Sequence, residues 1–228
     1  MLNGLDALIE KQQSIYLNAF KHPMAQPELQ LTGADRKPES GLLVVARYSH
    51  ELSGLLAEAS QLVADTIPAI CFTPDTVYTG LIVGPRLHDL DHSEAEAMVL
   101  QTQRWFFEDA LPIGRELRKQ VQFQFTDWLF NSNTLIAASK ANNKYWELAQ
   151  LLASSAEQAG ISANIPWGSH VTVSRFVANQ LPSEELRSAV QQLPKLPTEV
   201  VTPIGMDLIR YECDNHAFRL ISSDVWSS

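Results

Sequence analysis

The stretch HVTVSRF, residues 170–176, decides how this chain is interpreted. With the two-residue period of a strand, Val171 and Val173 point to one layer, and His170, Thr172 and Ser174 point to the opposite face. Two interpretations are open. The polar face of a half-exposed antiparallel strand meets water, or the polar face lines a cleft and takes part in chemistry. The rest of the chain has to decide between them.

The composition is that of an ordinary globular protein: 228 residues, 45% of them hydrophobic and 19% charged. Asp and Glu number 26 against 17 Lys and Arg, which gives a formal net charge of -9. This charge opposes indiscriminate binding to nucleic acid or to an anionic membrane surface. We therefore expect no bulk nucleic-acid binding and no membrane association, and an anionic ligand has to be held by a local group of residues. The oligomeric state is not indicated.

The N-terminal segment MLNGLDALIEKQQ carries acidic and polar residues where a signal peptide has a cationic patch and an apolar block. No apolar run reaches the roughly 18 residues of a membrane span. We therefore expect a cytoplasmic protein. Cys71 and Cys213 lie far apart in or beside apolar segments, which is typical of reduced, packed thiols.

Periodicity predicts a helix over residues 3–20, then an irregular connection rich in proline, with the folded core beginning near Gly41. The predicted division is thus 1–40, an N-terminal helix and connection, and 41–228, the main domain. Ser93 and Glu96 have the spacing of a capping box, which places a helix start. The predicted strands are 41–48, 77–84, 121–130, 133–139, 170–176, 204–213 and 217–226, and the predicted helices are 51–64, 94–109, 142–158 and a short one from Ser183.

Three segments together resemble the 2H phosphoesterase superfamily, which includes bacterial RNA 2′,3′-cyclic phosphodiesterases and RNA ligase-like proteins. SHVTVSRF is similar to the family's second H-x-T/S motif, FQFTDWLFNSNTLIAAS to its central hairpin, and MDLIRYECDNHAFRLISSDVW to its closing hairpin. The resemblance implies an α+β fold of two pseudo-symmetric lobes, mainly antiparallel sheet with helices. It also implies a cleft between the lobes, with His170 and Thr172 on its floor.

In such a family, two histidines hydrolyse a cyclic phosphate without a metal or other cofactor. One imidazole takes a proton from water and the other protonates the leaving ribose oxygen, which a pKa of about 6.5 allows at neutral pH. Hydroxyl and guanidinium groups hold the non-bridging oxygens. The resemblance therefore implies His170 as acid or base and Thr172 as a phosphate ligand.

The chain departs from the family pattern at the first motif. The strand in that place is VYTGLIVG, where the register of His170-Val171-Thr172 puts Tyr78-Thr79-Gly80. Tyr78 can donate a proton or a hydrogen bond but is a poor base at neutral pH. The protein is then either a weak or retired phosphoesterase, or it takes a second imidazole from elsewhere.

The segment HDLDHSE, residues 88–94, offers that second imidazole in His88. Three interpretations stay open: a solvated loop leading into a capped helix, a loop histidine that reaches the cleft, or a divalent-metal site of His88, His92 and a carboxylate. The proline at 85 and Ser93 argue against one helix carrying both histidines, so we predict no metal site.

Two further residues are candidate ligand contacts. Arg175 either binds a phosphate or pairs with an acidic neighbour, and Trp167, just before the motif strand, either stacks on a base or belongs to the core. The sequence thus predicts a metal-independent phosphodiesterase-like hydrolase that acts on a cyclic or 2′-5′ linked nucleotide or an RNA end, with weakened activity if no second imidazole reaches the cleft. The alternative is a non-catalytic module that binds a nucleotide or a phosphorylated small molecule in the same cleft.

Overall fold

The computed structural model describes residues 4–19, 38–177, 183–214 and 216–224. In these residues the strands form one eight-stranded antiparallel sheet of order β4-β5-β6-β3-β1-β7-β8, with β2 also paired to β6. The strands are β1 Glu39–Arg47, β2 Ala69–Cys71, β3 Thr79–Arg86, β4 Phe123–Phe130, β5 Thr134–Ala141, β6 Val171–Phe176, β7 Gly205–Cys213 and β8 Phe218–Asp224.

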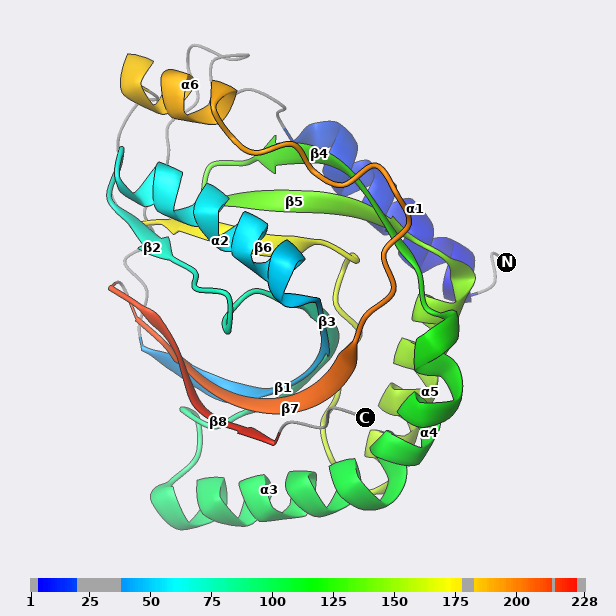
Figure 1. Ribbon diagram of the computed structural model, residues 1–228. Helices are drawn as coiled ribbons and strands as arrows, with labels where there is room; N and C mark the ends of the chain where they lie inside the picture. The colour runs from blue at the N-terminus through cyan, green and yellow to red at the C-terminus, as the bar shows by residue number, and fades with distance from the viewer. Residues whose placement is uncertain (1–3, 20–37, 178–182, 215, 225–228) are drawn as a thin grey trace.

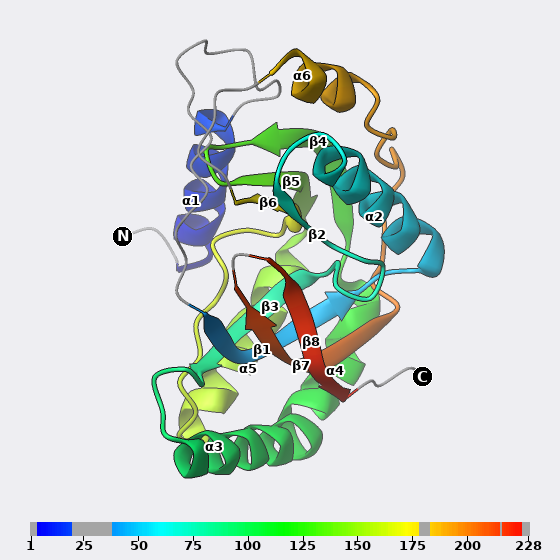
Figure 2. The ribbon, with the colours of Figure 1, turned by 90° about the vertical axis from the view of Figure 1, so that its left-hand side faces the viewer.

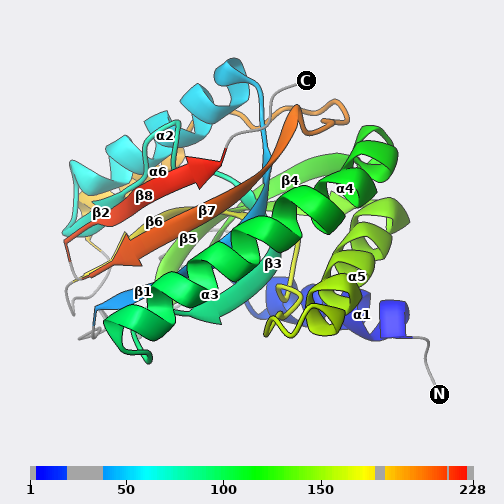
Figure 3. The same ribbon diagram turned by 90° about the horizontal axis from the view of Figure 1, so that it is seen from below.

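The helices lie on both sides of this sheet. They are α1 Gly4–Asn18, α2 His50–Ala64, α3 His92–Trp105, the π-helical turn η1 Phe106–Ala110, α4 Leu111–Leu117, the 3₁₀ turn η2 Arg118–Gln120, α5 Asn143–Gln158 and α6 Glu184–Gln191. The sheet curls, with β4, β5 and β6 in one arm, β1, β7 and β8 in the other, and β3 at the bend (Figure 1). Seen from below, α2 lies on one side of the sheet and α3, α4 and α5 lie on the other (Figure 3).

This architecture confirms the predicted α+β class with a mainly antiparallel sheet. Two elements, β2 and α4, were not predicted. β2 has only three residues, and α4 continues the line of α3 through η1, with Pro112 in its first turn, where proline is tolerated. Within the described ranges, no helix is both long enough and apolar enough to cross a membrane.

The start of α3 differs from the prediction. The capping box is formed by Asp91 and Glu94, not by Ser93 and Glu96. The Glu94 N–H donates to Asp91 Oδ1 (2.9 Å), and the Asp91 N–H donates to Glu94 Oε2 (3.2 Å). The Ser93 hydroxyl also donates to Asp91 Oδ1 (2.9 Å), so Ser93 supports the cap and does not form it. These bonds hold the pKa of Asp91 below its usual value.

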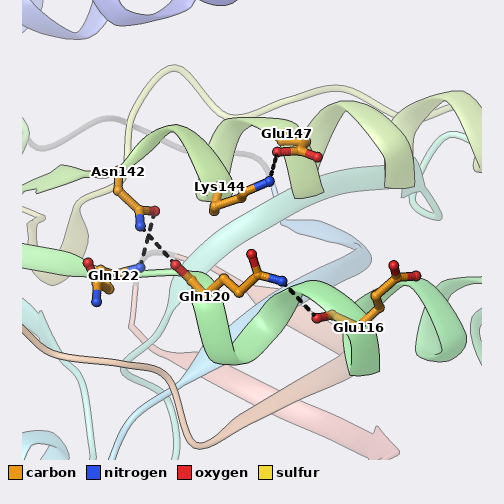
Figure 4. Close-up of polar contacts among 6 residues, drawn as sticks. All are labelled: Glu116, Gln120, Gln122, Asn142, Lys144 and Glu147. Carbon is orange, nitrogen blue, oxygen red and sulfur yellow. Dashed lines mark hydrogen bonds and ion pairs between the residues drawn. The ribbon is translucent and has the colours of Figure 1, made fainter.

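Asn142 fixes the start of α5 to the chain that enters β4 (Figure 4). Its amide donates to the Gln120 carbonyl (2.8 Å), and its Oδ1 accepts from the Gln122 N–H (3.2 Å). On the first turn of α5, Lys144 and Glu147 form an exposed ion pair of 2.6 Å, which contributes little to stability. Asn142 thus sets the position of α5 against the sheet.

The helix α1 packs beside β4, β5 and β6 (Figure 2). Tyr16 and Ala19 contact a small apolar cluster on β4 and β5. The predicted irregular connection, 20–37, lies outside the described residues, and the division of the chain at residue 40 stays a prediction.

Candidate functional site

A bulge in β6 sets which of its side chains share a face. In the pairing with β5, Ser174 lies opposite Leu135 and Thr172 lies opposite Ile136. One step along β5 therefore corresponds to two steps along β6, and Val173 is the extra residue. A bulge changes the alternation of side chains, so Arg175 joins His170 and Thr172 on one face. Ser174, predicted on that polar face, is instead fully buried on the other.

The two central strands, β3 and β6, meet at the directly opposed residues Thr79 and Val171. An antiparallel pair has a local twofold axis at such a point, and this axis relates Tyr78 to His170 and Gly80 to Thr172. The register expected for the first motif therefore agrees with the strand pairing.

Thr79 and α5 hold the two strands together. Thr79 Oγ1 shares a 2.6 Å hydrogen bond with the Tyr48 hydroxyl and also lies 3.3 Å from the His170 carbonyl oxygen. The Tyr145 hydroxyl of α5 donates to the Gly80 carbonyl (2.8 Å) and lies 3.3 Å from the Gly168 carbonyl oxygen. Both strands are thus fixed by buried bonds where the polar side chains project.

A cavity of about 200 Å³ lies over this part of the sheet. His170, Thr172, Arg175, Tyr78 and Trp167 all line it, so the structure brings together five of the six residues singled out from the sequence. The remaining walls are Leu43, Phe72, Thr76, Gly80, Val83, Pro166 and Gly168.

The imidazole of His170 is stacked under the indole of Trp167, with ring centroids 3.9 Å apart and planes at 21°. Its Nδ1 is buried and has no hydrogen-bond partner among the described residues. Burial lowers the pKa of His170 to about 3, and the positive charge of Arg175 acts in the same direction. The imidazole is therefore neutral at pH 7.

In the half of the cavity that corresponds to the first motif, neither the histidine nor the threonine of the motif is present. Tyr78 stands where the twofold axis repeats His170, and burial raises the pKa of its phenol above the usual value. Gly80 stands where the axis repeats Thr172, and a Cβ there would lie 3.1 Å from the Pro166 ring. The Pro166 side chain therefore fills the space of the second hydroxyl.

Arg175 is the positive charge of the cavity. Its Nη1 lies 3.3 Å from the Cys213 sulfur, and its guanidinium carbon lies 5.8 Å from the centre of the Phe218 ring. Among the described residues no carboxylate lies within ion-pair distance of it, whereas nearby Arg47 binds Asp207 at 2.6 Å. Arg175 was predicted either to bind a phosphate or to pair with an acidic neighbour, and the described residues contain no such acidic neighbour.

His88 does not line the cavity. It lies in the turn after β3, where its Nδ1 is 3.0 Å from the Ser40 carbonyl oxygen and 3.2 Å from the Ser40 nitrogen, and its Nε2 lies 3.5 Å from Asp89. His92 is the first residue of α3. In the described part of the chain, no group of three or more His, Cys, Asp or Glu side chains is arranged to hold a metal ion.

Sequence reasoning missed a buried polar network that supports the cavity wall. The Ser169 N–H donates to Gln12 Oε1 (2.6 Å), and the Gln12 amide donates to the Ser139 carbonyl (3.2 Å). Tyr16, one turn further along α1, contacts Trp167 edge to face at 6.0 Å. The signal was present in the sequence, since Gln12 interrupts an apolar stripe at helical spacing between Leu8 and Tyr16.

The curled antiparallel sheet and its helices have a 2H phosphoesterase-like fold, as the sequence resemblance predicted. Among solved structures, a conserved protein of unknown function, ATU0111 from Agrobacterium tumefaciens, superposes with a TM-score of 0.51 at 12% identity, covering 90% of this chain and 94% of that one.

Two other solved structures also align, at lower TM-scores. E. coli LigT complexed with 3′-AMP gives a TM-score of 0.47 at 13% identity over 84% of this chain and 100% of that one. The MHV ns2 PDE domain gives 0.41 at 14% identity over 73% and 99%. No family model matches the sequence, and no curated protein does. At these identities the likeness concerns the fold alone.

Proposed function

We propose that the protein is phosphodiesterase-like, that it binds a phosphate-bearing nucleotide or RNA end in the cavity over β3 and β6, and that it hydrolyses a cyclic phosphate there only slowly. The observation that carries this proposal is a cavity with a single imidazole beside an arginine that, in the described part of the chain, no carboxylate neutralises. The arginine supports binding, and the missing second imidazole limits turnover.

Anion binding is supported by the charges around the cavity. A guanidinium makes its strongest hydrogen bonds to phosphate and carboxylate oxygens, and Arg175 has a sulfur and an aromatic ring as neighbours in place of such a group. Thr172 adds a hydroxyl on the same face. The chain carries a net charge of -9, so this local positive charge is the kind of site that retains an anion.

Slow turnover follows from the number and state of the proton carriers. His170 has a pKa of about 3, far below the value near the operating pH at which a general acid or base works best. Tyr78 keeps its proton, because burial raises its pKa. Loss of one member of an acid-base pair commonly reduces a rate by about 10² to 10⁴.

A non-catalytic binding module is the second candidate, favoured by Tyr78 in the position of the first histidine and by Pro166 over Gly80. In that case the same cavity holds a nucleotide or another phosphorylated small molecule without turnover. The predicted cytoplasmic location is compatible with both candidates and stays a prediction.

The test is turnover and binding of 2′,3′-cyclic mononucleotides and a cyclic-ended oligonucleotide, with and without EDTA. We expect slow, EDTA-insensitive hydrolysis that His170→Ala abolishes. His88→Ala is the matched control, because His88 lies outside the cavity and its loss should change nothing. No turnover with saturable binding that depends on Arg175 would favour the binding module. Fast hydrolysis that EDTA abolishes would contradict both candidates.

A further inference from the structure

A second and larger cavity, of about 750 Å³, adjoins the first. The two share three wall residues, Val83, Pro166 and Trp167. The larger cavity is also lined by Lys11 of α1, by Arg86 at the end of β3 and by Asp89 in the turn that follows. The second cavity is therefore next to the first on the side of Trp167.

The first cavity is small for a whole nucleotide. Its 200 Å³ is less than the roughly 300 to 1,000 Å³ that small-molecule sites commonly enclose. A phosphate beside Arg175 and Thr172 takes part of that space, so the remainder of a nucleotide ligand has to continue outward. The larger cavity borders the first along Pro166 and Trp167.

The larger cavity offers positive charge for another anionic group. Lys11 and Arg86 both line it, and in the described residues neither has a carboxylate within ion-pair distance. The single lining carboxylate, Asp89, lies 3.5 Å from His88 Nε2. Two cations against one carboxylate, in a chain of net charge -9, attract a phosphate locally.

Lys11 is held at this position by its neighbour in the helix. Gln12 is buried and bonded to Ser169 and Ser139, so this turn of α1 is anchored to the segment that separates the two cavities. The position of Lys11 relative to Trp167 is thus built into the fold.

We propose that the larger cavity is a second binding subsite, in which Lys11 and Arg86 hold the next phosphate of a ligand whose first phosphate lies at Arg175. The preferred ligand is then a dinucleotide or the end of a longer strand, which binds more tightly than a mononucleotide. This inference rests on the proposed function, because it needs the first phosphate to bind at Arg175.

The experiment compares two probes with the same terminal group, a nucleoside 3′-monophosphate and a dinucleotide that ends in the same 3′-phosphate, by isothermal titration calorimetry. We expect the dinucleotide to bind about tenfold more tightly to the wild type, the effect of one charge-assisted contact. Lys11→Ala and Arg86→Ala should each reduce that advantage by about threefold, and the double variant should remove it. Mononucleotide affinity should stay unchanged in all three.

Lys119→Ala is the matched control, since Lys119 is exposed on η2 and lines neither cavity. Lys11→Glu is a second variant and should make the dinucleotide the weaker ligand of the two. If the mononucleotide binds but the dinucleotide has no advantage, or if the advantage survives the double substitution, the second subsite is wrong and the proposed function stands. If neither probe binds to the wild type, both proposals fail.

Discussion

Gln12 should act as a positioning residue for the cavity wall, and Gln12→Ala tests this. Its Oε1 accepts from the Ser169 N–H (2.6 Å) and lies 3.1 Å from the Ser169 hydroxyl, and its amide donates to the Ser139 carbonyl (3.2 Å). Ser169 is fully buried. The substitution therefore leaves a buried N–H without its acceptor.

The expected loss follows from these contacts. An unpaired buried N–H costs about 1 to 3 kcal/mol, and the lost bond to Ser139 about 1 kcal/mol more. We therefore expect Gln12→Ala to lower the free energy of unfolding by about 2 to 4 kcal/mol, which leaves a typical domain folded. The Ser169 hydroxyl keeps a partner, because it donates to the Ser139 carbonyl (2.9 Å).

The pKa of His170 distinguishes a positioning role of Gln12 from a general contribution to stability. The segment held by Gln12 carries Trp167, which covers His170, so a looser segment lets water reach the imidazole. We expect the pKa of His170 to rise in Gln12→Ala from about 3 toward 6.5.

Urea denaturation and an NMR titration of the His170 ring measure the two effects. The matched control is Gln13→Ala, because Gln13 is the exposed neighbour in the same helix, and its loss should change stability by less than about 0.5 kcal/mol. A Gln12→Ala protein as stable as this control, with an unchanged His170 pKa, would refute the positioning role.

Two further predictions concern His170 and its missing partner. The folded-state pKa of His170, about 3, lies below that of the unfolded chain, about 6.5, so the unfolded chain binds an extra proton between them. Stability should be full above about pH 6.5 and fall by about 1.4 kcal/mol per pH unit below it, and denaturation at pH 7 and 5 should show a smaller fall for His170→Gln. Tyr78→His restores an imidazole at the position related to His170 and should raise cyclic-nucleotide turnover by about tenfold or more; Tyr78→Phe, which adds no imidazole, should not.

Much of the site could be predicted because strand alternation and motif spacing are local properties. His170 and Thr172 share a face, as the pattern required, and Tyr78 falls at the related position on β3. The bulge at Val173 could not be predicted, because it depends on how β6 pairs with β5. That bulge buries Ser174 and places Arg175 in the cavity.

The other features of the site could not be predicted because they depend on contacts between residues far apart in the sequence. The pKa of His170 depends on burial under Trp167, and the position of Trp167 depends on α1, which lies more than 150 residues earlier in the sequence. The interrupted apolar stripe marked Gln12 as unusual but gave no partner for it. The shifted capping box shows a local limit, because Asp91 and Ser93 both have capping chemistry and only the geometry decides between them.

The most direct test of the account is the affinity of the cavity for a nucleotide with and without Arg175. We predict saturable binding of an adenosine 2′,3′-cyclic phosphate to the wild type, weakened by about 10- to 100-fold in Arg175→Ala and partly kept in Arg175→Lys. Arg104→Ala, which removes an exposed arginine near the end of α3, should bind like the wild type. No binding to the wild type, or equal affinity in Arg175→Ala, would contradict the claim that this cavity is a phosphate-binding site.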